Sequence, residues 1–256
     1  MHKPLPHRPN LDHLRRQAKT LLANLARGEG EAVGLFQFYL PAAGGKSARE
    51  LAEAGFRLAD AQSVIARSTG FAAWPQLARH VEQLRALEGV WELESLVVDG
   101  EPVAGHILSV SRIQIDGDRF CVESPGGRSQ GEFNLDVEPM PHHIDIAFGD
   151  GVLAGRNHTG IFRLADERLE LCLDRTGLAR PSVLESGPDS HHSYHVLRRV
   201  SPGSIRLGQT ETPPHVGADL HAVEKVTSLR AEAAAGDALR TATRASVHRL
   251  VPFVHV

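Results

Sequence analysis

Histidine is the residue type that offers this chain most of its possible chemistry. The sequence has 15 histidines in 256 residues, and His106, His158, His191, His192 and His195 precede or begin short segments of β-type sequence. A neutral imidazole can hold a metal ion, exchange a proton near neutral pH, or hydrogen-bond the polar group of a bound molecule. The alternative is that these are ordinary loop histidines of a histidine-rich protein.

A metal site is one prediction for this group, with His106, His158 and His192 as the ligands. Imidazoles suit zinc, copper or iron, and three of them leave coordination positions open for a substrate or oxygen. The spacing favours such a site only weakly, because His191 and His195 would lie roughly 13 Å apart along an extended strand. The sequence leaves the cofactor unknown, and a histidine-bound zinc, copper or iron ion is the candidate that it offers.

Acid–base catalysis and ligand binding are the two other predictions. The reference pKa of histidine, about 6.5, suits proton transfer near neutral pH, so His158, His192 and His195 are the catalytic candidates. A binding site would instead use its histidines to orient a polar group among apolar side chains. The residues predicted to contact such a ligand are His106, Phe162, Leu164 and Tyr194.

Several common sites have no support in the sequence. It contains no G-x-G-x-x-G, G-x-S-x-G, H-E-x-x-H or C-x-x-C motif, which argues against dinucleotide-binding, hydrolase, zincin and thiol redox sites. Gly44-Gly45-Lys46-Ser47 ends like a phosphate-binding loop, but the first glycine that this motif requires would fall at Leu40. Cys121 and Cys172 alternate with apolar neighbours and are expected to point away from the barrel interior.

The overall composition is that of a folded protein without a nucleic-acid or membrane partner. Hydrophobic residues make up 41% of the chain and charged residues 23%, and the formal net charge of −3 argues against a general affinity for nucleic acid. Residues 1–9 lack the apolar core of a signal peptide, and no apolar run is long enough for a membrane span. We therefore expect a soluble, cytoplasmic protein.

From Gly89 onward the sequence changes from a helical to a two-residue period. Eight short runs follow, separated by turn signals such as Asp116-Gly117, which suits a tight hairpin. Strands at this spacing predict a closed up-and-down antiparallel barrel, which has no exposed sheet edge; a two-layer sandwich is the alternative. The predicted strands are 90–98, 109–115, 120–123, 132–137, 143–148, 159–164, 168–173 and 193–200.

Such a barrel would bring the candidate histidines together at one end. They lie before or at the start of the second, sixth and eighth strands, which begin at the same end of an up-and-down barrel. Because successive residues face opposite sides, His158 should point inward together with Phe162. In the last strand His192 shares a face with Tyr194, and His195 lies on the other face. One histidine of the group is therefore expected outside the barrel.

Helices are predicted before and after the barrel in the sequence. Asn10 can cap a first helix that ends at Gly28, a second helix stops before Pro41, and two more cover about 58–68 and 75–87. Beyond Pro202 apolar residues recur at helical spacing, with a partly disordered tail as the alternative. The predicted fold is α+β: a helical bundle over 1–86, an eight-stranded barrel over 87–202 and a helical tail over 203–256.

A set of motifs runs in order through the barrel region: Leu87-Glu88-Gly89-Val90-Trp91, Gly131-Glu132-Phe133-Asn134-Leu135-Asp136, Pro141-His142-His143-Ile144-Asp145 and Leu197-Arg198-Arg199. Together they resemble an uncharacterised bacterial family of lipocalin-like domains. The resemblance implies a calycin-type barrel and no established reaction. It also implies that Trp91 lies under Arg198 or Arg199 and closes one end of the barrel. The family usually has a lysine where His142 stands here, so no role of that lysine carries over.

The helical region contains a second set of motifs over residues 11–83, among them Gly70-Phe71-Ala72-Ala73-Trp74-Pro75 and His80-Val81-Glu82. They resemble a short helical module that precedes ankyrin repeats and other domains in bacterial proteins, and no ankyrin signature follows here. The resemblance implies a portable accessory unit that could bind a protein partner.

Three functions are compatible with these features. The leading hypothesis is a barrel that binds a small, largely apolar molecule. The second is an enzyme that uses the histidine-lined end of the barrel, with a metal or by acid–base chemistry, as an isomerase, cyclase or oxygenase of a specialised pathway. The third is a regulatory or scaffold protein that acts through its helices.

Overall fold

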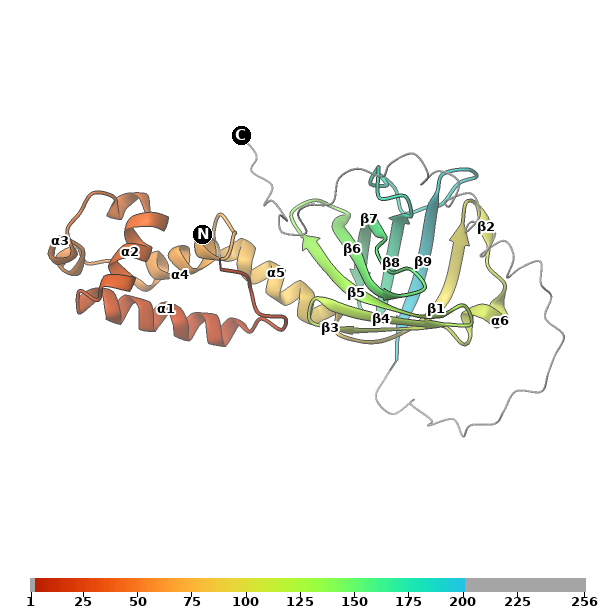
Figure 1. Ribbon diagram of the computed structural model, residues 1–256, viewed down its shortest axis with the longest axis horizontal. Helices are drawn as coiled ribbons and strands as arrows, with labels where there is room; N and C mark the ends of the chain where they lie inside the picture. Colours follow the sequence, from red (N-terminus) through yellow and green to blue (C-terminus); the bar gives the residue numbers. More distant parts are fainter. Residues whose placement is uncertain (1–2, 201–256) are drawn as a thin grey trace. The chain divides into compact units, whose positions relative to one another are not determined.

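The chain folds into a set of packed helices followed by a closed antiparallel β-barrel (Figure 1). The computed structural model describes residues 3–200, all of which belong to one compact unit. The α+β class predicted from the sequence is confirmed for these residues. The helical tail predicted for 203–256 lies outside the described residues, and the domain boundary between residues 86 and 87 stays a prediction.

Local signals in the sequence set where the helices begin. The Asn10 side chain accepts hydrogen bonds from the backbone N–H groups of Asp12 and His13 at 2.9 and 3.0 Å, which caps the first helix. Ser47 and Glu50 form a capping box for a short helix that the apolar spacing did not predict. The helices before the barrel are α1 (Leu11–Ala26), α2 (Gly30–Tyr39), the 3-10 helix η1 (Pro41–Ala43), α3 (Ala48–Glu53), α4 (Leu58–Ser68) and α5 (Trp74–Leu87).

These helices pack through an apolar core of their own. Leu25, Phe36, Leu51 and Val64, from four different helices, are buried in one cluster. Burial of these side chains stabilises the arrangement, because none of the short helices would be stable alone. Within residues 3–200, no helix has the length and apolar character needed to cross a membrane.

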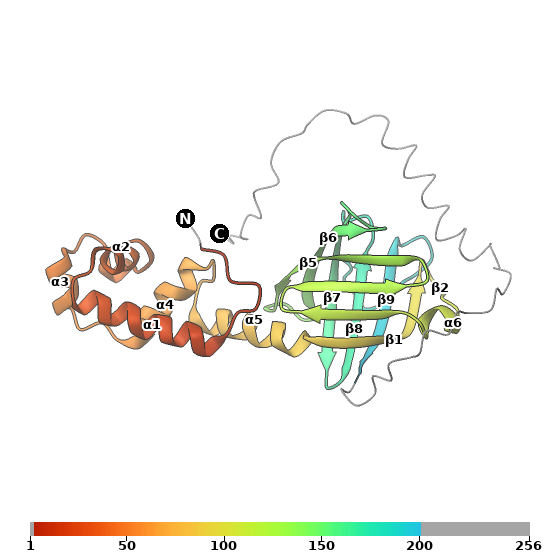
Figure 2. The same ribbon diagram turned by 60° about the horizontal axis from the view of Figure 1, so that its bottom comes forward.

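Eight antiparallel strands close into the barrel (Figure 2). The first strand pairs with the last from Trp91 to Val98, so the sheet has no open side there and the sandwich alternative is wrong. A two-residue strand, β2 (Glu101–Pro102), pairs with the end of the first strand and is followed by a short helix, α6 (Gly105–Leu108). The barrel strands are β1 (Gly89–Val98), β3 (Arg112–Asp116), β4 (Arg119–Ser124), β5 (Gly127–Asp136), β6 (His142–Gly151), β7 (Asn157–Ala165), β8 (Arg168–Asp174) and β9 (His192–Arg199).

One end of the barrel is sealed around a tryptophan. Trp91 is fully buried, and its indole Nε1–H donates a hydrogen bond of 2.9 Å to the carbonyl oxygen of Leu87. The Arg199 guanidinium carbon lies 4.2 Å from the centroid of the Trp91 ring. The same guanidinium donates hydrogen bonds to the carbonyl oxygens of Ala86 and Glu88. Arg199 thus ties the end of α5 to the barrel while it stacks on the indole.

The sequence left open whether Arg198 or Arg199 covers Trp91, and in the structure it is Arg199. Arg198 faces outward, where it forms ion pairs with Glu92 at 3.7 Å and Glu94 at 3.2 Å. Gly89 makes room for Arg199: it has φ of +133°, and a Cβ there would lie 2.8 Å from the guanidinium. The motif Gly89-Val90-Trp91 therefore has a packing role at this end.

We predict that Arg199→Ala lowers the free energy of unfolding by about 1 to 3 kcal/mol, because it removes the cation–π contact and two hydrogen bonds. Arg198→Ala is the matched control and should cost less than about 1 kcal/mol, since it removes only exposed ion pairs. Urea unfolding followed by circular dichroism measures both. Equal losses for the two variants would contradict the assigned closure.

Candidate functional site

The two ends of the barrel interior differ in how fully side chains fill them. At the Trp91 end the inward-facing residues form one buried core with the indole, including Phe133, Leu135, Phe162, Leu169 and Leu197. At the opposite end, where β1 and β8 finish and β7 and β9 begin, Ile146, Phe148 and Leu173 belong to the same buried core, whereas inward-facing aliphatic residues on β1 and β4 are partly buried. We call this the open end. Strand pairing turns Leu96 and Val98 of β1 and Val122 of β4 inward at this end, and each of these side chains is partly buried.

Among the polar side chains that face this interior, we call three the inner polar group: Ser129 on β5, His158 on β7 and His195 on β9. Each has a buried polar atom without a hydrogen-bond partner among the described residues, namely Ser129 Oγ, His158 Nε2 and His195 Nδ1. A buried polar atom left unpaired costs about 1 to 3 kcal/mol. Three such atoms in one barrel interior are candidates for a polar contact with a water or a bound molecule.

His158 points inward as the sequence predicted. It pairs with Ile146 on β6, is 6% exposed, and its ring lies 5.0 Å from that of Phe148 in an edge arrangement. Burial lowers the pKa of His158 to about 4, and the positive charges of Arg156 and Arg175 add to this lowering, whereas Asp174 opposes it. The imidazole is therefore neutral at neutral pH.

His195 lies on the inward face of β9, between Leu96 and Leu171 of the neighbouring strands. Its Nε2 is 3.0 Å from the hydroxyl of Ser193, while its Nδ1 is buried. Burial lowers the pKa of His195 to about 4, and the nearby His158 contributes to the shift. The two rings are thus close enough to influence each other, and both are neutral.

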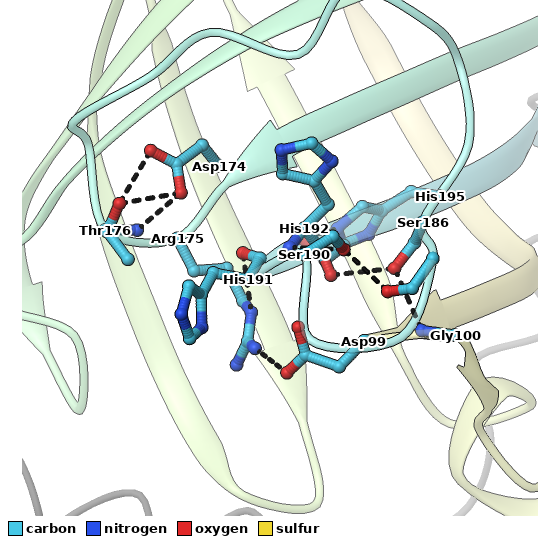
Figure 3. A network of polar contacts seen from close by, with 12 residues as sticks. Asp99, Gly100, Asp174, Arg175, Thr176, Ser186, Ser190, His191, His192 and His195 are labelled. Carbon is cyan, nitrogen blue, oxygen red and sulfur yellow. Dashed lines mark hydrogen bonds and ion pairs between the residues drawn. The ribbon is translucent and has the colours of Figure 1, made fainter.

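The rim of the open end is held by a polar network (Figure 3). Arg175, just after β8, forms an ion pair with Asp99, just after β1, and its Nε donates to the carbonyl oxygen of His191 at 3.3 Å. The Ser186 hydroxyl accepts from Gly100 N–H at 3.3 Å and donates to the carbonyl oxygen of His192 at 2.9 Å. These bonds fix the turn after β1 against the connection between β8 and β9.

Two residues predicted for the site lie on the outer face instead. The pairing of Val97 with Tyr194 and of Asp174 with His192 places Tyr194 and His192 outside, because neighbouring residues across a strand pair share a face. The Tyr194 hydroxyl donates a hydrogen bond of 3.0 Å to the carboxylate of Glu170. Tyr194 therefore does not line the interior, and His192 is not brought to His158 or His195.

The predicted metal ligands are not assembled in this structure. His106 is exposed on α6, His192 faces outward and His158 faces inward. Among residues 3–200, no group of three or more His, Cys, Asp or Glu side chains could hold a metal ion. The prediction that His106, His158 and His192 bind one metal ion is therefore wrong for this structure, because the three side chains lie on different surfaces.

Phe162 and Leu164 face the interior as expected, but at the Trp91 end. Phe162 is 1% exposed and lies opposite Leu171, and its ring is 5.3 Å from the His142 ring. Leu164 is partly buried against the same core. Both side chains therefore fill the closed half of the barrel rather than surround the inner polar group.

Ser129 and Ser193 are site residues that the sequence pattern missed. Ser129 lies on β5 ahead of the segment expected as a strand, and it shares the inward face with Phe133. Ser129 lies four residues before Phe133 and so faces the same side of the strand. This signal could have identified it if the predicted strand had begun at Gly127. Ser193 could have been found in the same way from its parity with His195.

Comparisons with known proteins add a distant structural likeness. No family model and no curated protein matches the chain. Among solved structures, the barrel region is similar to the crystal structure of a DUF4847 family protein from Bacteroides vulgatus, with 14% identity and a TM-score of 0.30. The match covers 46% of this chain and 96% of the other. A likeness this distant carries no argument about function.

The low pKa values predict an acid sensitivity of the fold. Unfolded histidines take up protons below pH of about 6.5, whereas His158 and His195 in the folded barrel stay neutral down to about pH 4. The unfolded state therefore gains protons first, and the free energy of unfolding should fall as the pH drops through this window, by up to about 3 kcal/mol per histidine. Urea unfolding at about pH 7 and about pH 5 measures the effect.

Two histidine variants, one inside the barrel and one on an exposed helix position, test the cause of this pH dependence. Replacing both His158 and His195 with leucine should reduce the pH dependence, while His13→Leu at an exposed position of α1 should leave it as it is. NMR signals of the His158 and His195 rings that titrate near their ordinary value, about pH 6.5, would contradict the account.

Proposed function

We propose that the protein binds a small, largely apolar molecule inside the open half of its barrel. The sequence motifs that resemble lipocalin-like domains support this proposal, because such barrels enclose a space lined by inward-facing side chains. The ligand would lie among Leu93, Leu96 and Val98 and would hydrogen-bond to the inner polar group.

The observation that carries the proposal is the set of unpaired polar atoms among partly buried aliphatic side chains. Ligand sites combine apolar walls with a few placed polar groups, and Ser129, His158 and His195 provide such groups in this barrel. A barrel interior with a purely structural role would be more stable with apolar residues at these three positions.

The alternative of acid–base catalysis has less support from the site. A general acid or base works best with a pKa near the working pH, and burial lowers the pKa of both His158 and His195 to about 4. Neutral imidazoles with low pKa values suit hydrogen bonding to a ligand better than proton transfer at neutral pH. A protein partner for the helices stays a prediction from the sequence.

A change that fills the open half tests the proposal. The uncharged fluorescent probe N-phenyl-1-naphthylamine should bind the protein with increased emission, and Leu96→Trp should weaken its binding at least about tenfold, because the added volume occupies the interior. Val97→Trp is the matched control, since Val97 is the next residue on β1 and pairs with Tyr194 on the outer face. Its binding should equal that of the unchanged protein.

Fluorescence titration of the three proteins, with thermal unfolding as the check of folding, decides the outcome. No binding to the unchanged protein, or equal effects of the two tryptophans, would reject a binding site inside the barrel.

A further inference from the structure

The interior positions of the barrel are poor in charge. Among the described strand residues that face inward, Arg199 has the one charged side chain, and it is stacked on Trp91 at the closed end. The open half offers two neutral imidazoles, the Ser129 and Ser193 hydroxyls, aliphatic surface and the ring of Phe148. No inward-facing residue there could neutralise a charge on a buried ligand.

Charges near the rim are already engaged or lie in solvent. Arg175 forms an ion pair with Asp99, and the Asp174 carboxylate accepts hydrogen bonds from the backbone N–H groups of Thr176, Leu178 and Ala179. Arg156 is exposed. A carboxylate or ammonium group brought to the inner polar group would therefore lose its hydration without gaining an opposite charge, which is costly.

The imidazoles set a second requirement on the ligand. A neutral imidazole has one N–H donor and one acceptor nitrogen, and in both His158 and His195 one buried ring nitrogen is without a partner. A hydroxyl group can donate and accept, so it can satisfy either nitrogen in either tautomer. A carbonyl oxygen can accept from the N–H form.

We infer that the ligand class is an uncharged, mainly aliphatic molecule with a hydroxyl or carbonyl oxygen, which hydrogen-bonds to His158 Nε2 and His195 Nδ1. This inference rests on the proposed binding of an apolar molecule in the open half. It adds that the site selects against carboxylates and amines of the same length.

Four ten-carbon compounds test the selectivity. At neutral pH, decan-1-ol and decan-2-one should displace N-phenyl-1-naphthylamine from the full chain at concentrations at least about tenfold lower than decanoate and decylamine do. The reason is that decanoate and decylamine each carry a charge, which would lose its hydration without gaining an opposite charge. The readout is the loss of probe fluorescence, confirmed by calorimetry for decan-1-ol.

Single substitutions test which residues carry the selectivity. His158→Leu and His195→Leu should each weaken decan-1-ol binding by about fivefold to tenfold, as expected for one hydrogen bond. His143→Leu is the control, because His143 pairs with Asp136 and Ile161 on the outer face of β6 and is not part of the site. Thermal unfolding of each variant checks that it is folded.

The outcomes separate this inference from the proposed function. Decanoate or decylamine binding as tightly as decan-1-ol, or leucine variants that bind decan-1-ol unchanged, would overturn the ligand class and leave a binding barrel in place. Failure of the probe and of all four compounds to bind would overturn both.

Discussion

The feature on which the rest of the account depends is the burial of two neutral imidazoles with unpaired nitrogens inside a closed barrel. Each unpaired atom costs stability, and leucine or phenylalanine would fill the same positions without that cost. Proteins keep such costly groups mainly at sites that act on something else. The unpaired atoms of His158, His195 and Ser129 are therefore the basis of the proposed ligand site in the open half of the barrel.

The closure of the barrel explains why the polar atoms lie at one end. Pairing of β1 with β9 creates an inside, and Trp91 with Arg199 seals one end of it. Aromatic and aliphatic side chains pack around Trp91 at that end of the interior. The ion pair of Arg175 with Asp99 fixes the rim of the open end, and the described strand residues that face inward in the open half carry no charge.

Much of the fold could be predicted from the sequence, because two-residue periodicity and turn residues are local signals. The inward direction of His158 followed from its parity with Phe162. The side of β9 could not be decided in this way, since the alternation within the strand leaves two choices until its pairing with β8 places His195 opposite Leu171. Ser129 was missed because the glycine-rich, polar start of β5 looks like a turn until its pairing with β4 is known.

A crystal structure of the full chain grown with decan-1-ol would test the central claim most directly. The account predicts the alcohol oxygen within hydrogen-bonding distance of His158 Nε2 and His195 Nδ1, with the alkyl chain against the side chains of Leu96 and Val98. Alcohol bound only on the outer surface or among the helices, with both nitrogens bonded to the protein itself, would contradict it.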